Sequence, residues 1–173
     1  FVAFSDEILA QGGVVYGAGY NSHFIVSHKR ATTIEERDEF RGSRYVQSNL
    51  VGIFAKVKED LNNGKKVLFS GTPCQTAGLT SYLGPRLRDN LYLVDIICHG
   101  VPSPKLWSDY LAYQENKYHT VVTKVDFRNK VDFGWDDHRE TLWFSDKKRS
   151  FNIYTHFFYL DSFLRDCCFD CKF

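Results

Sequence analysis

Two short apolar runs near the middle of the chain organise the pattern of hydrophobic and polar positions. Val67 to Ser70 and Leu91 to Ile97 are rich in β-branched or large apolar residues, and each precedes a turn that carries glycine, proline and cysteine. Between them, Gln75 to Leu83 has the length of a helix and ends at Gly84-Pro85, a typical stop signal. The pattern predicts a strand, a helix and a second strand, with the two strands parallel.

Each of the two turns after these strands carries a cysteine. Parallel strands end at the same edge of a sheet, where open α/β sheets bind ligands, so we expect Cys74 and Cys98 to lie near each other. Thr72, Pro73 and Gln75 have the spacing of a helix cap, a first-turn proline and a capping box. Cys74 then falls in the first helical turn, where free N–H groups and the helix dipole favour a thiolate. A structural buried cysteine is the alternative.

The remaining apolar and polar positions predict further elements on both sides of this unit. Helices are expected at residues 1–10, 34–40, 50–61, 104–117 and 155–164, and strands at residues 14–20, 23–28, 120–128, 140–145 and 149–153. The first two of these strands form a hairpin about Asn21-Ser22, and the last two form another. The expected fold class is α/β, with a mixed, partly parallel sheet, flanking helices and a β-hairpin extension.

Composition limits the kind of protein that this can be. With 173 residues, 43% hydrophobic and 16% aromatic, the chain can form one core, so we expect a single domain over residues 1–173. A net charge of +1 gives no reason to expect nucleic acid as a partner, and no apolar run is long enough to span a membrane. The chain contains no methionine and begins within a helical pattern, so we expect a piece of a longer protein, incomplete at both ends.

The cysteines point to a metal centre. They are five in number, and three lie within five positions near the end of the chain, which argues against a disulfide framework and for a reducing, cytoplasmic location. Cys168 and Cys171 have the C-x-x-C spacing of metal ligands, and Cys167 is an extra thiol. With Cys74 and Cys98 they make four candidate ligands. A structural zinc, an iron-sulfur cluster and a redox dithiol are all open, and the isolated positions of Cys74 and Cys98 favour the cluster.

Two polar loops carry side chains that could contact a ligand. Residues 41–49 (RGSRYVQSN) supply arginines, serines, a glycine, a tyrosine and a glutamine, which could hold a phosphate or a flavin edge. The same composition also suits an ordinary solvated connection. In the later loop, Arg128, Lys130, Trp135 and His138 could face either a substrate or solvent.

Five motifs in the chain resemble, in order and spacing, the coenzyme F420 hydrogenase/dehydrogenase beta subunit family. They are GGVVYGAGY, RGSRYVQS, VLFSGTPCQTAGL, VDIICHGVPSP and the closing CCFDCKF. The resemblance covers nearly the whole chain, and GTPCQ together with CHGVPSP carries most of its specificity. It implies an α/β oxidoreductase subunit that passes electrons between a [4Fe-4S] cluster, FAD and a hydride carrier or substrate, which is coenzyme F420 in archaeal relatives.

The resemblance also implies roles for particular residues. Cys74, Cys98, Cys168 and Cys171 would be the cluster ligands. The residues expected to contact the flavin are Arg41, Gly42, Ser43, Tyr45, Gln47, Thr72 and Gln75. His99 would either hydrogen-bond a cluster sulfur or hold its loop in place. The implied partners are an electron-donor or electron-acceptor subunit or a ferredoxin-like domain, and a small-molecule redox substrate.

Two other functions compete with this interpretation. The four cysteines could hold zinc in a non-catalytic interaction module, which would carry no flavin absorbance band. Alternatively, Cys74 could act as a nucleophile with His99, although the sequence offers no third group that would orient the histidine.

Overall fold

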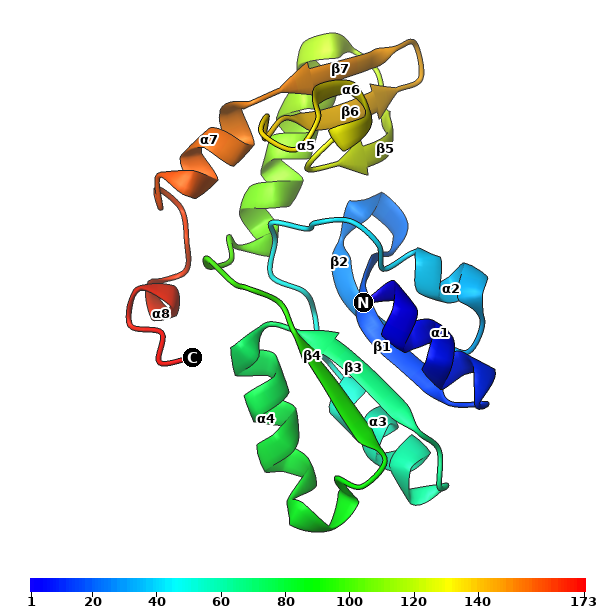
Figure 1. The fold of residues 1–173 in the computed structure, drawn as a ribbon. Helices are drawn as coiled ribbons and strands as arrows, with labels where there is room; N and C mark the ends of the chain where they lie inside the picture. Colours follow the sequence, from blue (N-terminus) through cyan, green and yellow to red (C-terminus); the bar gives the residue numbers. More distant parts are fainter.

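The computed structural model describes residues 1–173 and contains two β-sheets, each with its own helices (Figure 1). The first sheet has the strand order β2-β1-β3-β4. Its strands are β1 (Val14–Tyr20), β2 (Val26–Ala31), β3 (Val67–Gly71) and β4 (Leu91–Asp95). β2 is antiparallel to β1, whereas β1, β3 and β4 run parallel to one another. This is the mixed, partly parallel sheet that the sequence predicts.

Helices cover both faces of the first sheet. They are α1 (Val2–Ala10) and α2 (Ile34–Asp38) on one face, and α3 (Ile53–Asn62) and α4 (Pro73–Leu83) on the other (Figure 1). The alternation of a strand explains the two layers, because Tyr16 packs with α3 and α4 whereas its neighbour Val15 packs with α1. α2 begins at a capping box formed by Thr33 and Glu36, as the spacing predicts.

The second sheet is antiparallel, with the strand order β5-β6-β7. It contains β5 (Val122–Asp126), β6 (Glu140–Phe144) and β7 (Lys148–Phe151), accompanied by α5 (Pro104–Tyr118), α6 (Lys130–Phe133), α7 (Ile153–Tyr159) and α8 (Asp166–Phe169). Short 3-10 turns, η1 (Ser22–Phe24) and η2 (Pro85–Leu87), complete the elements. The three strands were all expected, and they pair with one another instead of extending the first sheet.

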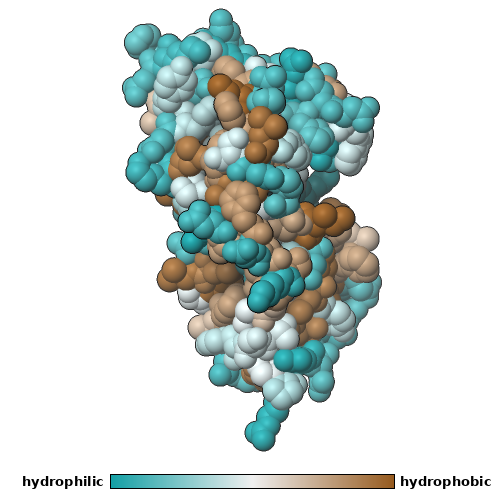
Figure 2. All heavy atoms as spheres, turned by 90° about the vertical axis from the view of Figure 1, so that its left-hand side faces the viewer, coloured by the Kyte–Doolittle hydropathy of each residue, from teal (hydrophilic) through white to brown (hydrophobic).

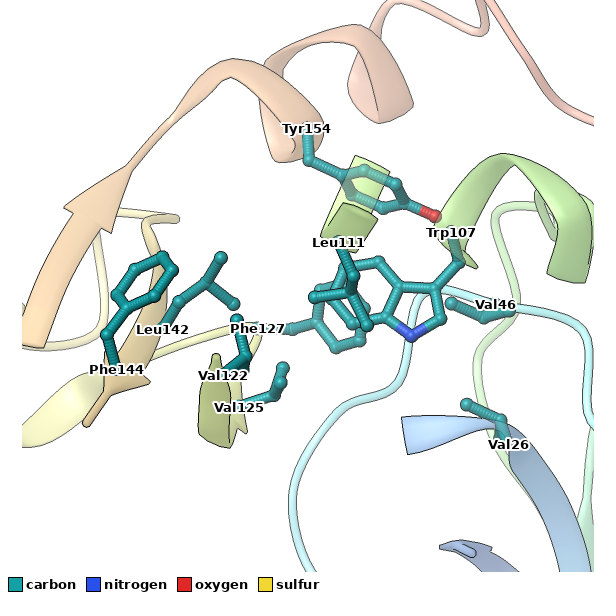
Figure 3. Close-up of a cluster of buried hydrophobic side chains, with 10 residues drawn as sticks. All are labelled: Val26, Val46, Trp107, Leu111, Val122, Val125, Phe127, Leu142, Phe144 and Tyr154. Atoms are coloured by element: carbon teal, nitrogen blue, oxygen red, sulfur yellow. The ribbon is translucent and has the colours of Figure 1, made fainter. Parts of the chain in front are cut away.

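A shared hydrophobic core joins the two sheets around Trp107 of α5 (Figure 3). Its indole is 2% exposed and lies 4.6 Å, centroid to centroid, from the Phe127 ring. Val26 of β2 and Val46 of the following loop pack in the same cluster, and the indole N–H donates to the Phe24 carbonyl at 3.0 Å. The core therefore fixes the position of the second sheet against the hairpin end of the first.

Several predicted boundaries differ from those observed, and three of these differences lie near the edge of the first sheet or the C-terminal segment. β2 begins at Val26 instead of residue 23, because η1 occupies the start of the expected strand. β4 ends at Asp95, and the residues that follow leave the sheet. α7 ends at Tyr159 instead of residue 164, since Asp161 adopts a left-handed conformation with φ +57°. None of the helices combines the length and the apolar character that crossing a bilayer requires.

Candidate functional site

The carboxyl ends of β3 and β4 lie side by side, with Gly71 paired to Asp95. Thr72 caps α4, and Cys74 falls in the first turn of this helix, as predicted. The Thr72 N–H donates to Gln75 Oε1 at 3.0 Å, which is the return bond of the capping box. The Thr72 hydroxyl lies 3.1 Å from the Cys74 sulfur.

Cys98 lies near the other three predicted ligand cysteines at this edge of the sheet. Burial raises the pKa of Cys98, and the nearby thiols of Cys74, Cys168 and Cys171 raise it further. Cys167, the extra thiol, is exposed. The four thiols form no compact group, because no three histidine, cysteine, aspartate or glutamate side chains gather closely enough to hold a single metal ion.

Backbone contacts bring the C-terminal cysteines to the β4 edge. The Arg165 N–H donates to the Val101 carbonyl at 3.1 Å, and Leu164 pairs with Pro102 in an isolated antiparallel bridge. Burial raises the pKa of Cys168, and a hydrogen bond from the Val101 backbone opposes that rise. The segment after β4 thus carries Cys98, and its backbone contacts position the C-terminal segment that carries Cys168 and Cys171.

A cavity of about 990 Å³ opens between the two sheets beside these cysteines. It is lined by six of the seven predicted flavin contacts, namely Arg41, Gly42, Ser43, Tyr45, Thr72 and Gln75. Gln47 lies outside this lining, because its side chain accepts from Arg165 and its N–H donates to the Pro102 carbonyl. Cys98 and His99 line the cavity, so its wall is continuous with the cluster of thiols.

The second sheet supplies the opposite wall of the cavity. Arg128, Lys130 and Trp135 line it, and the Lys130 ammonium lies 3.5 Å from the centroid of the Trp135 indole. Arg128 Nη2 donates to the Trp135 carbonyl at 2.9 Å. His138 is not part of the lining but lies behind it, 3.0 Å from Arg128. Three of the four side chains suggested by the later loop therefore face the cavity.

Comparison with known proteins identifies the family. Residues 64–173 match the model for the C terminus of the beta subunit of coenzyme F420 hydrogenase/dehydrogenase. The chain belongs to this family. Its predicted family resemblance is thereby confirmed, and membership associates the chain with an oxidoreductase role. A comparison with curated protein sequences gave no match.

A solved structure shares the fold of this family member. It is a chain of the F420-reducing [NiFe] hydrogenase complex from Methanosarcina barkeri, studied as a xenon derivative, with a TM-score of 0.63 and 16% sequence identity. The alignment covers 98% of this chain and 57% of that chain. Our chain thus spans a little over half the length of that relative, and the likeness concerns the fold.

His99, the histidine of the C-H-G motif, contacts Phe158 of α7 and Asp161 just after it. Its Nε2 lies 2.6 Å from Asp161 Oδ1, and its ring lies 5.2 Å from the Phe158 ring, centroid to centroid. Of the two roles expected for His99, these contacts favour holding the loop in place. The bond to Asp161 ties the Cys98 loop to the segment that leads to Cys168 and Cys171.

Several residues in the lining were missed by sequence reasoning. Phe158 and Tyr159 lie in a stretch that looks like an ordinary apolar helix, yet both line the cavity. Tyr45 stacks on Phe158 at 4.5 Å, and burial raises its pKa to about 12. His28 and Ser48 also line the cavity. They are 20 residues apart, and only the pairing of β2 with the loop at residue 49 brings them together.

The face of the molecule that carries α7 and α8 exposes large apolar side chains. Figure 2 shows hydrophobic residues across the middle of this face, among hydrophilic ones. Those exposed near the C-terminal cysteines are Phe157, Leu160, Phe169 and Phe173. Apolar surface of this kind is typical of sites where another protein binds.

Proposed function

We propose that this chain is the cofactor-binding part of an iron-sulfur flavoprotein subunit. It would pass electrons between a [4Fe-4S] cluster, FAD and a hydride carrier or other small redox substrate. One observation carries the proposal: Cys98 lines the cavity that holds six predicted flavin contacts, and it also lies among the other three predicted ligands. A cluster bound by the thiols and a flavin bound in the cavity would therefore both contact the loop that carries Cys98.

The four cysteines fit a cluster better than a single ion. A zinc ion draws its thiolates to about 2.3 Å from one centre, whereas a [4Fe-4S] cluster takes each thiolate on a separate iron. Cys74 and Cys98 follow separate strands and lack the paired spacing of a zinc knuckle, which favours the cluster.

The cavity fits a flavin in size and in chemistry. Its volume of about 990 Å³ lies at the upper end of the range of small-molecule sites. Arg41, Gly42 and Ser43 offer side-chain and backbone donors on one side, and Tyr45 offers an aromatic face. Gly42 has φ +91° and nothing near the position of a Cβ, so its backbone is open to a ligand.

Residues of the chain would shape the reaction around these groups. When bound, the cluster would supply single electrons, and the flavin would combine two of them with a proton for transfer as a hydride. The stacked rings of Tyr45 and Phe158 supply an apolar part of the cavity wall. Arg128 and Lys130 on the opposite wall would attract an anionic group of the substrate. Coenzyme F420, which the name of the structural relative includes, is the first substrate to test.

The exposed apolar face beside the cysteines suits a partner. Cys74 and Cys171 are exposed there, so electrons could enter or leave without crossing the core. We propose that an electron-donor or electron-acceptor subunit, or a ferredoxin-like domain, contacts this face near α8. A cytoplasmic location follows from the same proposal, because free thiols of this kind persist in a reducing compartment.

The decisive experiment is cofactor analysis after anaerobic purification. We expect about four irons, matching sulfide and flavin per chain, with the broad absorbance of an iron-sulfur flavoprotein. Cys74→Ser should lose most of the iron and keep the flavin. Cys167→Ser makes the same chemical change at a thiol outside the predicted ligand set, so it should keep both.

The alternative outcomes lead to different conclusions. Zinc in place of iron, without flavin, would contradict the proposal and support a non-catalytic zinc module. Equal loss of iron in Cys74→Ser and Cys167→Ser would show that the ligand set is wrong. Flavin without iron would leave a flavoprotein whose cysteines serve another purpose.

A further inference from the structure

A chain of hydrogen bonds runs along the cavity wall formed by β2, the loop after residue 41 and the start of α4. His28 is 4% exposed, and its Nε2 lies 3.0 Å from the Ser70 carbonyl oxygen. Its Nδ1 lies 2.8 Å from Ser48 Oγ, which in turn lies 2.9 Å from Gln75 Nε2. The Thr72 N–H donates to Gln75 Oε1 at 3.0 Å. We call these five residues the His28 network.

The chemistry of the partners sets the direction of every bond. A carbonyl oxygen can only accept, so His28 Nε2 carries a hydrogen and donates to Ser70. Burial lowers the pKa of His28, so the ring is neutral at pH 7 and Nδ1 accepts from the Ser48 hydroxyl. The Ser48 oxygen then accepts from the Gln75 amide N–H.

Close packing holds this arrangement in place. The His28 ring stacks on Phe69, with centroids 5.0 Å apart and an angle of 10° between the rings. A Cβ at Gly71 would lie 3.0 Å from Gln75 Oε1 and 2.9 Å from the Phe69 ring. The amide of Gln75 is thus enclosed on the side of the sheet, and a change of its orientation would break two hydrogen bonds at once.

We propose that His28 is a positioning residue that orients the Gln75 amide so that an N–H, and not a C=O, faces the cavity. Gln75 lines the cavity, and its second Nε2 hydrogen has no acceptor in the protein. The ligand atom at this wall is then a hydrogen-bond acceptor, such as a ring nitrogen or carbonyl oxygen of a flavin. This inference rests on the proposed function, because it assigns the polarity of one predicted flavin contact.

Gln75→Glu tests the direction of the network. The variant keeps the acceptor for the Thr72 N–H and removes both amide donors. Ser48 would turn its hydroxyl toward the new carboxylate, and His28 would then have to donate from Nδ1 by taking up a proton. NMR of the ring nitrogens should show neutral His28 protonated on Nε2 in the wild type, and a raised His28 pKa in the variant.

The same variant tests the ligand contact. FAD binding, followed by flavin fluorescence, should weaken at least about tenfold, because an acceptor would then face an acceptor. Gln11→Glu is the matched control, since it makes the same change at an exposed residue just after α1. It should alter neither the His28 pKa nor the affinity for FAD.

Each outcome bears on the inference. An unchanged His28 pKa in Gln75→Glu would overturn the assigned direction, and an unchanged FAD affinity would overturn the assigned polarity of the contact. Failure of the wild-type chain to bind FAD would contradict the proposed function, while the NMR measurement would still decide the orientation of Gln75. Should Gln75→Glu not fold, Ser48→Ala frees the amide to rotate, and an unchanged FAD affinity there would also count against the inference.

Discussion

The two walls that meet at the cysteine-bearing edge are held in different ways. His28, Ser48 and Thr72 of the His28 network are buried, and the network's hydrogen bonds are made within the protein. The other wall, which we call the thiol segments, consists of residues 96–101 and 164–171. Its thiols are free, Ile97 is fully exposed, and a few backbone contacts join its two parts. The first wall is held by hydrogen bonds within the protein, whereas the proposed cluster would add metal–thiolate bonds to the second.

The largest expected effect follows from this difference and concerns iron loading. Hydrogen exchange of the thiol segments should slow by more than about 100-fold when the proposed cluster is bound, because metal binding contributes roughly 10 kcal/mol to the order of small thiolate sites. The His28 network should exchange slowly in both states. Mass spectrometry of loaded and iron-depleted protein would measure both walls at once. Equal protection of the thiol segments in loaded and iron-depleted protein would contradict the proposed difference between the two walls.

A second prediction concerns the stability of the buried wall. His28→Phe keeps the ring that stacks on Phe69 and removes both of its hydrogen bonds. Unfolding in urea should become easier by about 1–3 kcal/mol, the usual cost of leaving buried polar groups unpartnered. His156→Phe, at an exposed histidine of α7, should change stability by less than about 0.5 kcal/mol. Similar costs for the two variants would mean that the His28 bonds contribute little.

The pH dependence of stability should separate the wild type from His28→Phe. Burial lowers the pKa of His28 below its usual value of 6.5. Below pH 6.5, His28 therefore binds a proton more readily in the unfolded chain than in the folded chain. The contribution of neutral His28 to the free energy of unfolding is complete above about pH 6.5. It is lost as pH falls toward the lowered pKa, by up to about 1.4 kcal/mol per pH unit.

Urea unfolding of the wild type and of His28→Phe between pH 5 and pH 8 would measure this effect. Below pH 6.5 the free energy of unfolding should fall more steeply for the wild type than for the variant. The difference in stability between the two proteins should therefore become smaller as pH falls. Both proteins contain the same other histidines, so the difference between the two curves isolates His28. Parallel curves would show that His28 is not buried as a neutral ring.

Local signals made the β3, α4 and β4 region predictable from sequence. Thr72 and Gln75 have capping-box spacing, and the strands on either side of the helix are short and apolar. These signals lie within a few residues, so they specify a strand, a helix and a strand without help from the rest of the fold. The convergence of Cys74 and Cys98 followed from topology alone, because parallel strands share an edge.

The His28 network could not be predicted in this way. His28 is in contact with Ser48 only because β2 pairs with the loop at Asn49, whereas the sequence pattern predicts that the next helix begins at residue 50. In the structure that helix starts after Gly52, whose φ of +76° makes the turn. Gln47 was misplaced in the cavity for a related reason. Its chemistry suits a flavin, but the register of the loop turns it toward Arg165.

The smallest expected effect lies within the thiol segments and concerns the His99–Asp161 pair. Both side chains are nearly half exposed, so the pair should contribute less than about 1 kcal/mol to global stability. Asp161→Asn is a clean test, because asparagine tolerates the left-handed backbone at φ +57°. We expect the unfolding midpoint to stay unchanged and hydrogen exchange of residues 98–101 to rise severalfold. Unchanged exchange would mean that backbone contacts such as Arg165 to Val101 hold the loop, and that His99 is free for another role.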